Sequence, residues 1–266
     1  MRIVEKITVI LFAAVLMAFV GTRIYIRKAV DQTPPVISCQ SEELVLSVSA
    51  TTSQLLQGVT AQDDRDGDLT RQIIIQGVTP LLETNTAKVT YVVFDSANNM
   101  ATCQRTIRYT DYEKPHFFLT EPLIYSTGAE IDLMDRLGAT DAAGEDISGS
   151  IRITAQNVSV NDEGTYRVTV QATNALGDTE ILTLPLVINN RMAEEKKLTL
   201  SDYIVYLTAG GSYRSADYIV FDADTDKAEI LPYVKVQGKV DTRTPGTYEV
   251  TYTYQSYTVT QTVIVK

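Results

Sequence analysis

The sequence predicts an all-β protein, with three tandem β-sandwich domains preceded by one N-terminal transmembrane helix. Three features support this fold class. An uncharged apolar stretch, Ile7 to Thr22, lies near the start of the chain. After it come short runs of alternating Val, Ile, Thr and Tyr, separated by Gly, Pro, Asn and Asp turns, which is a strand pattern. This pattern repeats about every 80 residues, a period that indicates whole domains and not solenoid units.

The N-terminal stretch predicts a membrane span. Its apolar character resumes after Arg23, so residues 7–26 reach the length of about 20 that a bilayer core requires. No A-x-A triplet follows, which favours an uncleaved signal anchor over a cleaved signal peptide. We expect a short cytoplasmic tail at 1–6, a transmembrane helix at 7–26 and a linker at 27–33.

Two signals bear on the orientation of this span, and they disagree. Arg2 and Lys6 precede it, whereas Arg23, Arg27 and Lys28 follow it, so the positive-inside rule does not favour an external C-terminus. The remainder is β-rich and acidic and contains a cysteine pair, which suits an oxidising, extracytoplasmic location. We therefore expect a single-pass protein of the cell membrane with its C-terminal domains extracellular, and the membrane itself as a partner through the helix.

The internal repeats define the domains. The segment "GTYRVTVQATN" from Gly164 aligns with "GTYEVTYTYQS" from Gly246, and "NTAKVTYVVFD" from Asn85 is the first copy. Each unit has room for about seven short strands, as an immunoglobulin-like sandwich requires. The expected boundaries are 34–110 for Ig-like domain 1, 111–191 for Ig-like domain 2 and 192–266 for Ig-like domain 3.

Two copies also carry the pattern of a tyrosine corner, in which a phenol hydrogen-bonds back to the turn before its strand. The segment "DEGTYRV" places Tyr166 in this position, and the repeat places Tyr248 there. Domain 1 has Ala87 instead, so a corner in that domain would lack its phenol.

The segments "PPVIS", "GVTAQDDRDGDLTRQIIIQG" and "KVTYVVFDSANNMATCQRTI" of domain 1, with "VQGKVDTRTPGTYEVTYTY" of domain 3, resemble a known family. They are similar to the bacterial immunoglobulin-like repeat domains that occur in tandem on Gram-positive surface proteins and are appended to some pesticidal crystal proteins. The resemblance is weaker in domain 2. It implies β-sandwich modules that serve as stalks, spacers or adhesive units, without catalytic residues.

The acidic stretch "QDDRDGDLT", residues 62–70, contains a frame that recurs in all three domains: an acid, then five residues later a second acid followed by an aliphatic residue. Such carboxylates can accept backbone N–H bonds and cap a short helical turn. We interpret them as structural turn and cap residues: Asp63 and Asp68, Asp141 and Asp146, and Asp224 and Glu229.

The same stretch has acids that suggest calcium, and two readings stay open. Asp64 and Asp66 do not recur in the other domains, and with Asp68 they form a candidate calcium set particular to domain 1. Their spacing does not satisfy an EF-hand loop, because Leu69 and Ile75 stand where glycine and glutamate are needed. The alternative is a solvated turn without metal. We expect no other cofactor.

The two cysteines, Cys39 and Cys103, lie in the first and last strands expected for domain 1. Their counterparts in domain 2 are Leu119 and Leu182, so the positions face inward. A structural disulfide is favoured by an external location and would stabilise the domain by about 4 kcal/mol on the loop-entropy model. Two free core thiols are the alternative.

The composition narrows the function. The net charge of -10 argues against nucleic acid as a partner, and one histidine, His116, with two cysteines leaves few parts for a catalytic or zinc site. We expect no enzyme, and keep enzymatic activity only as a remote alternative. The leading hypothesis is a surface protein that presents its domains for adhesion to an envelope protein or glycan, with the tyrosine-rich domain 3 as a possible binding face. The alternatives are a passive structural stalk or an accessory subunit of a membrane complex.

Overall fold

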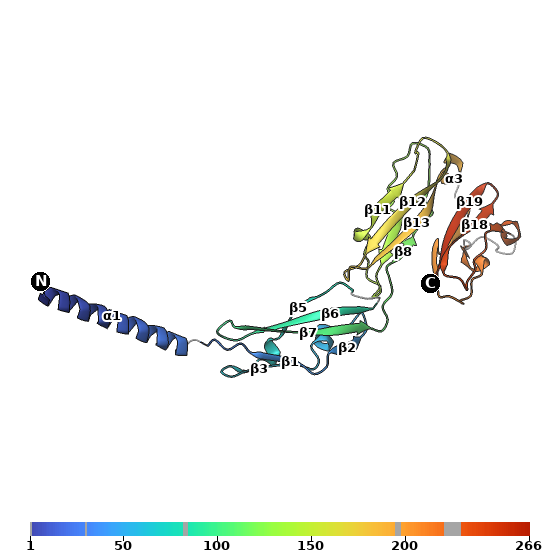
Figure 1. Cartoon of the computed structure of the whole chain (residues 1–266). Helices are drawn as coiled ribbons and strands as arrows, with labels where there is room; N and C mark the ends of the chain where they lie inside the picture. The colour runs from blue at the N-terminus through green and yellow to red at the C-terminus, as the bar shows by residue number, and fades with distance from the viewer. Residues whose placement is uncertain (1, 30, 82–84, 195–197, 221–229) are drawn as a thin grey trace. The chain divides into compact units, whose positions relative to one another are not determined.

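The computed structural model describes residues 2–29, 31–81, 85–194, 198–220 and 230–266. The chain divides into two compact units, Met1–Thr110 and Asp111–Lys266 (Figure 1). The first unit contains the N-terminal helix and domain 1, and the second contains domains 2 and 3. Apart from the long helix, the regular structure is almost entirely strands, which confirms the predicted all-β class of three immunoglobulin-like sandwiches behind one apolar helix.

The N-terminal helix α1 runs from Arg2 to Ala29. Within it, the 21 residues Ile3–Arg23 have a mean hydropathy of 2.4 and none of this window is buried inside the protein. Large apolar side chains such as Phe12 and Met17 are exposed all round the helix. A helix of this kind has the length and composition to cross a membrane, and a signal sequence has the same properties.

Domain 1 pairs a three-stranded sheet with a four-stranded sheet. Strand β2 runs parallel to β7 at the edge of the second sheet, and all other pairs are antiparallel. The first sheet has the order β1 (Val36–Cys39), β3 (Val59–Asp63), β4 (Gly67–Asp68), and the second the order β2 (Glu43–Leu46), β7 (Met100–Tyr109), β6 (Thr86–Phe94), β5 (Ile74–Val78). Two short helical segments complete the domain, α2 (Thr52–Leu55) and the 3-10 turn η1 (Thr70–Gln72).

Domain 2 repeats this plan. A two-stranded sheet of β8 (His116–Leu119) and β10 (Leu137–Thr140) faces a four-stranded sheet. The latter has the order β11 (Arg152–Gln156), β12 (Gly164–Thr173), β13 (Thr179–Ile188), β9 (Ile124–Tyr125), with β9 parallel to β13. The 3-10 turn η2 (Ser148–Ser150) precedes β11, as η1 precedes β5, and the short helix α3 (Asn190–Glu194) follows β13.

Domain 3 has the same sheet pair in its described residues. Its two-stranded sheet contains β14 (Thr199–Leu200) and β16 (Ile219–Val220), and its four-stranded sheet has the order β17 (Lys235–Gln237), β18 (Gly246–Tyr254), β19 (Tyr257–Val265), β15 (Ile204–Leu207). The parallel edge pair is β15 with β19. The 3-10 turns are η3 (Ser215–Tyr218) and η4 (Leu231–Tyr233).

The alternation in the repeated strand sorts its two faces. In β12, Val168, Val170 and Ala172 are fully buried while Arg167 is exposed. Strand β18 buries Val250 and Tyr252 in the same phase, and β6 buries Val89, Tyr91 and Val93. One strand in each domain therefore supplies the centre of the core, because its inward side chains are apolar at every second position.

Domains 2 and 3 share apolar contacts within the second unit. Ile204 and Ile264 of domain 3 pack into the core of domain 2, while Ile124 of domain 2 packs into the core of domain 3. Arg167 and Glu249 form a bidentate ion pair across the same boundary. Both side chains are partly exposed, and ion pairs of this kind contribute little to stability. The shared burial, and not the ion pair, joins the two domains.

Candidate functional site

The first acid of the recurrent frame caps a turn in domain 1. Asp63 ends β3, and its Oδ1 accepts backbone N–H bonds of 2.9 Å from Arg65 and from Asp66. Gly67 closes this β3–β4 turn with a left-handed backbone, φ 75°, which glycine adopts without strain. The turn thus requires glycine at this position for a structural reason.

The second acid caps the 3-10 turn that follows. Asp68 Oδ1 accepts a bond of 2.9 Å from the N–H of Thr70, at the start of η1. Hydrogen bonds from Thr70 lower the pKa of Asp68. The bond from the Thr70 side chain has the larger effect, and the bond from its backbone N–H has the next largest. Leu69 and Ile73, on either side of η1, are both buried. The acid holds the turn while the two aliphatic residues fix it to the core.

Domain 2 contains the same two caps. Asp141 Oδ1 accepts from the N–H groups of Ala143 and Glu145, at 2.9 and 3.0 Å. Asp146 Oδ1 accepts from the Ser148 N–H at 2.9 Å and from its hydroxyl at 2.6 Å, at the start of η2. The predicted counterparts in domain 3, Asp224 and Glu229, lie outside the described residues.

The structure does not bring Asp64, Asp66 and Asp68 together as a metal site. Asp64 is exposed, and Asp68 is occupied with η1. Both oxygens of Asp66 accept bonds from Ser96, at 2.6 Å from its N–H and 2.9 Å from its hydroxyl. Spacing in sequence failed as a guide here because successive residues of a tight turn point in different directions.

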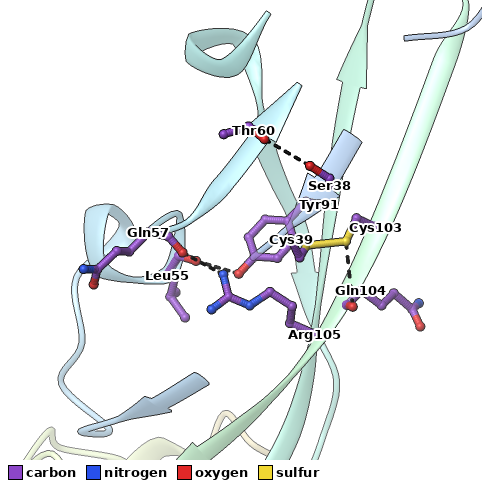
Figure 2. Close-up of a disulfide and its surroundings, with 9 residues drawn as sticks. All are labelled: Ser38, Cys39, Leu55, Gln57, Thr60, Tyr91, Cys103, Gln104 and Arg105. Carbon is purple, nitrogen blue, oxygen red and sulfur yellow. Dashed lines mark hydrogen bonds between the residues drawn. A yellow bond between two sulfur atoms is a disulfide. The ribbon is translucent and has the colours of Figure 1, made fainter. Parts of the chain in front are cut away.

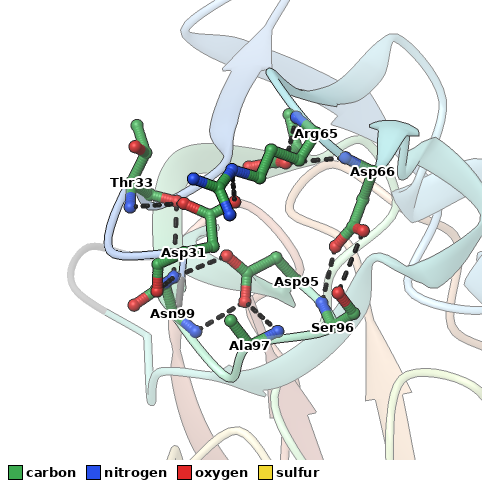
Figure 3. Close-up of polar contacts among 9 residues, drawn as sticks. Asp31, Thr33, Arg65, Asp66, Asp95, Ser96, Ala97 and Asn99 are labelled. Carbon is green, nitrogen blue, oxygen red and sulfur yellow. Dashed lines mark hydrogen bonds and ion pairs between the residues drawn. The ribbon is translucent and has the colours of Figure 1, made fainter. Parts of the chain in front are cut away.

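The carboxylates that do converge in domain 1 come from three separate segments. They are Asp31 from the linker, Asp63 from the end of β3 and Asp95 from the turn after β6. Figure 3 shows Asp31 and Asp95. One oxygen from each lies within 4.8 Å of the others. The bonds from Ser96 to Asp66 hold the last two of these segments side by side. Within the described residues, this is the one group of three or more potential metal-binding side chains that lie so close.

Asp95 organises its own turn. Its Oδ1 accepts from the N–H groups of Ala97 and Asn99, at 2.9 and 2.7 Å, and its Oδ2 accepts from the Asn99 side chain at 2.7 Å. Burial alone would raise the pKa of Asp95, but the bonds from Asn99 and Ala97 together lower it. Asp95 is therefore an ionised carboxylate at neutral pH in spite of being only 6% exposed.

Asp31 ties the linker to domain 1. Its Oδ1 accepts from the N–H of Thr33 at 2.9 Å, and its backbone carbonyl accepts from the Asn99 side chain at 3.2 Å. The guanidinium Nε of Arg65 lies 3.4 Å from Asp31 Oδ2 (Figure 3). Neither Asp31 nor Asp95 is among the site residues predicted from the sequence. A signal existed: Asp31 and Asp111 each stand five residues before the first strand of their domain, at Val36 and His116.

The two cysteines lie where the sheets of domain 1 meet. Cys39 ends β1 in the first sheet, Cys103 lies in β7 of the second, and a disulfide joins them (Figure 2). Beside it, Arg105 is only 3% exposed and donates from Nη1 to the Gln57 carbonyl at 2.7 Å. Tyr91 donates its hydroxyl to the Leu55 carbonyl at 2.5 Å. These polar contacts tie helix α2 to the core next to the disulfide, which has a structural position.

The residues predicted to form tyrosine corners make the defining contact. Tyr166 donates its hydroxyl to the backbone carbonyl of Asp162 at 2.9 Å, and Tyr248 donates to that of Thr244 at 2.8 Å. In both cases the acceptor lies four residues earlier, in the turn before the strand. Domain 1 has the fully buried Ala87 at this position.

Most tyrosines of domain 3 serve its core. Tyr213 and Tyr252 each place the hydroxyl within hydrogen-bonding distance of the buried Gln261 Oε1, at 2.6 and 3.0 Å, and 3.0 Å from one another. Burial raises the pKa of both phenols, so they stay neutral donors. Tyr203 and Tyr257 are also buried. These four tyrosines therefore belong to the core of the domain and not to an exposed binding face.

Two tyrosines of domain 3 instead line a surface hollow of about 450 Å³ beside the β18–β19 turn. Tyr233, at the end of η4, is 70% exposed, and Tyr254 ends β18. The other lining residues are polar: Lys235, Thr253 and Gln255. Aromatic rings beside a few polar groups make a surface able to receive a ligand with apolar faces and hydroxyl groups.

Comparison with known proteins confirms the resemblance of these domains to bacterial immunoglobulin-like repeats. Residues 200–265 match the family "Bacterial surface protein, Ig-like domain", and residues 30–109 match the HYR domain. Both are non-catalytic domain types. The chain thus carries immunoglobulin-like modules of a kind found on bacterial surface proteins.

Among curated proteins, the chain is similar to the pesticidal crystal protein Cry22Aa of Bacillus thuringiensis, with 27% identity over 205 residues. The match covers 72% of this chain, which spans only 27% of the length of that relative.

Solved structures give weaker likenesses. One contains the CBM51-2 domain, in complex with GlcNAc, and INT domains of ZmpB from Clostridium perfringens, at 19% identity and a TM-score of 0.24, covering 56% of this chain and 26% of that one. Another is the lipoprotein BT2262 of Bacteroides thetaiotaomicron, at 11% identity and a TM-score of 0.21, covering 86% and 98%. The family matches, and not these superpositions, support the functional argument.

Proposed function

We propose that this chain is a membrane-anchored surface protein that presents its immunoglobulin-like domains for binding in the bacterial envelope. The observation that carries the proposal is the hollow beside the β18–β19 turn, formed by Tyr233, Tyr254 and three polar residues in a domain that matches the bacterial surface Ig-like family. The mechanism is presentation of a binding face, with no covalent chemistry.

The helix α1 supplies the anchor in this proposal. The 21 residues Ile3–Arg23 span about 32 Å at 1.5 Å per residue, which matches the thickness of a bilayer core. Because none of this window is buried inside the protein, lipid is the environment that removes its apolar side chains from water. Arg23, whose guanidinium lies 5.5 Å from the centre of the Phe19 ring, extends its charge to the interface.

The chemistry of the hollow favours a glycan as the ligand. The exposed ring of Tyr233 offers a face on which a sugar ring can stack, although a single tyrosine provides less of this than tryptophan would. Lys235, Thr253 and Gln255 supply donors and acceptors that match hydroxyl, carboxylate or acetamido groups. A peptide ligand would find few apolar pockets here.

Binding of the full chain in lipid nanodiscs to purified cell-wall glycan tests this proposal. We expect retention on the glycan, and a loss of at least fivefold in affinity for Y233A and for K235Q. The matched control is V236A, because Val236 lies on the opposite face of the same strand β17. If Y233A, K235Q and V236A bound the glycan equally well, the hollow would not be the binding site. Retention on envelope material that protease treatment abolishes would point to a protein partner.

A passive stalk is the second candidate, and the shared burial of domains 2 and 3 favours it. Ile204 and Ile264 contact the core of domain 2, so these two domains form one compact unit, as a spacer requires. A spacer has no ligand of its own. Failure of the full chain to bind any envelope fraction, while its surface position is retained, would support the stalk over the binding protein.

A further inference from the structure

We propose that Asp31, Asp63 and Asp95 form a calcium site at the base of domain 1, where the linker meets the first sandwich. The three side chains come from segments far apart in sequence, yet one oxygen of each lies within 4.8 Å of the others. All are carboxylates, so the group offers the hard oxygen ligands that Ca²⁺ takes, and no nitrogen or sulfur.

The charge of this group calls for a divalent ion. Asp31 and Asp95 are buried, and Asp63 is half-buried, so water screens their mutual repulsion poorly. Arg65 forms an ion pair with this group, with its Nε 3.4 Å from Asp31 Oδ2 and 48% of its side chain exposed. Three carboxylates and one guanidinium leave a formal charge of two negative, which one divalent cation neutralises.

An independent observation on Asp63 supports a cation at this place. Oxygen Oδ2 of Asp63 has less than 1 Å² of exposed surface and no hydrogen-bond partner among the described residues. Its other oxygen caps the turn through Arg65 and Asp66. A buried carboxylate oxygen without a donor is costly, because it has lost its water and gained nothing in return. A cation at the point where the three carboxylates meet would supply the missing partner.

The remaining coordination positions also fit calcium. Ca²⁺ takes six to eight oxygens and accepts irregular geometry, whereas Mg²⁺ demands a near-ideal octahedron and retains its waters. Asp31 Oδ1 and Asp95 Oδ2 each accept one hydrogen bond, so each still has a lone pair, since a carboxylate oxygen has two. Three carboxylates from loops, completed by water, suit the larger and more tolerant ion.

Domain 2 provides an internal comparison, because it builds the same turn around an amide in place of Asp95. Asn174 stands at the position of Asp95 and accepts the same pair of backbone bonds, from Leu176 and Asp178, both at 3.0 Å. Its amide donates to the hydroxyl of Tyr112 at 3.1 Å, which donates to Asp178 at 2.6 Å. An amide at this position therefore preserves the turn, and Tyr112 links it by hydrogen bonds to the carboxylate of Asp178.

The proposed ion would link the linker to the body of domain 1. Asp31 precedes β1 and belongs to the segment that follows helix α1, while Asp63 and Asp95 belong to two loops of the sandwich. In this structure, Arg65 holds the linker through the Asp31 carboxylate, and the Asn99 side chain holds it through a hydrogen bond to the Asp31 carbonyl. Calcium would add a direct bond from each of the three segments to a common centre, so the linker would stiffen when calcium is present.

Isothermal titration of the full chain in detergent, first treated with chelator, tests the site. We expect one Ca²⁺ per chain with a dissociation constant on the order of 0.1 to 1 mM, the range of extracellular modules. D63N and D95N should bind at least tenfold more weakly. The matched controls are D64N, an exposed acid of the same turn, and D141N, the domain 2 counterpart of Asp63, and both should bind as the unmodified chain does.

Hydrogen exchange gives a second readout that does not depend on binding heats. Calcium should slow exchange of the Thr33 amide in the unmodified chain and in D64N, and should have no effect in D95N, whose turn Asn174 shows to be compatible with an amide. The proposal is overturned if millimolar calcium gives no heat and no protection, or if D63N and D95N bind like D64N. Equal affinity for Mg²⁺ would overturn the assignment to calcium.

Discussion

The hydroxyl oxygen of Tyr206, in strand β15 of domain 3, accepts a hydrogen bond of 2.8 Å from the backbone N–H of Phe117 in strand β8 of domain 2. The Tyr206 ring stacks on His116 with centroids 4.0 Å apart, and Lys266 Nζ lies 4.6 Å from its centre. Burial, the largest influence, raises the pKa of Tyr206, so the phenol is neutral. One side chain of domain 3 thus completes the hydrogen bonding of a strand in domain 2.

Removal of that hydroxyl should weaken the unit formed by domains 2 and 3. In Y206F the buried N–H of Phe117 loses its acceptor, which we expect to cost about 1 to 3 kcal/mol. Calorimetry of the full chain measures the effect as a lower melting temperature. The control is Y233F, because Tyr233 is 70% exposed and makes no contact in the shared core. Equal melting temperatures for the two variants would contradict this role of Tyr206.

Mild acid should destabilise the same contact through His116. Burial, then Lys266, lowers the pKa of His116 below 6.5, and Glu113, 3.4 Å from its Nε2, opposes them. Because the folded-state pKa is the lower one, the unfolded chain binds the proton more readily, so stability is full above about pH 6.5 and falls as the pH drops below it. The melting temperature of the second unit should decrease between pH 7.5 and 5.5.

The variant H116F provides the control for that titration, because phenylalanine keeps the stack on Tyr206 and carries no titrating group. We expect H116F to lose most of the pH dependence in this range. An identical slope in H116F and the unmodified chain would assign the effect to other groups.

Stronger acid should act on the turn caps. Bonds from the Ser148 hydroxyl, and next from its N–H, lower the pKa of Asp146 below 3.8. A depressed folded-state pKa stabilises the fold above the unfolded value and loses this contribution as the pH falls through the folded value. We expect D146N to melt below the unmodified chain at pH 5 to 7, and the gap to close as the pH falls through the lowered pKa of Asp146. E130Q, which changes an exposed acid of the same domain, should show no such gap.

The disulfide should account for much of the stability of domain 1. With a sequence separation of 64 between Cys39 and Cys103, reduction should lower the free energy of unfolding by about 4 kcal/mol on the loop-entropy model. Domain 2 places Leu119 and Leu182 at the same positions, so the double variant C39L/C103L is a matched control that packs there without a bond. Its unfolding should not respond to reductant. If the unfolding of the unmodified chain were also insensitive to reductant, the disulfide would not stabilise domain 1.

Much of the fold could be predicted from the sequence because the pattern is written three times. The alternation of apolar and polar residues predicts which side chains of β12 face inward, and the same alternation occurs in β18. The caps at Asp63, Asp68, Asp141 and Asp146 followed from comparison of the copies. These features depend on local backbone periodicity, which a single sequence displays directly.

The converging carboxylates could not be found in this way. Asp31 and Asp95 are 64 positions apart and meet only because β1, β3 and β6 bring their ends to one edge of domain 1. Local spacing predicted a calcium site with Asp64 and Asp66 instead. In the structure, Asp64 is exposed to solvent and Asp66 accepts hydrogen bonds from Ser96. The contact between Tyr206 and Phe117 was missed for the same reason, since it depends on packing between domains.

Thiol labelling in intact bacterial cells tests the central claim most directly, because it reports on the location of domain 1 and on the bond between Cys39 and Cys103 together. A membrane-impermeant maleimide is applied before and after treatment with an impermeant reductant. We expect no labelling before reduction, and labelling of both cysteines after reduction without cell lysis. Labelling that requires lysis would place the domains inside the cell and contradict the account.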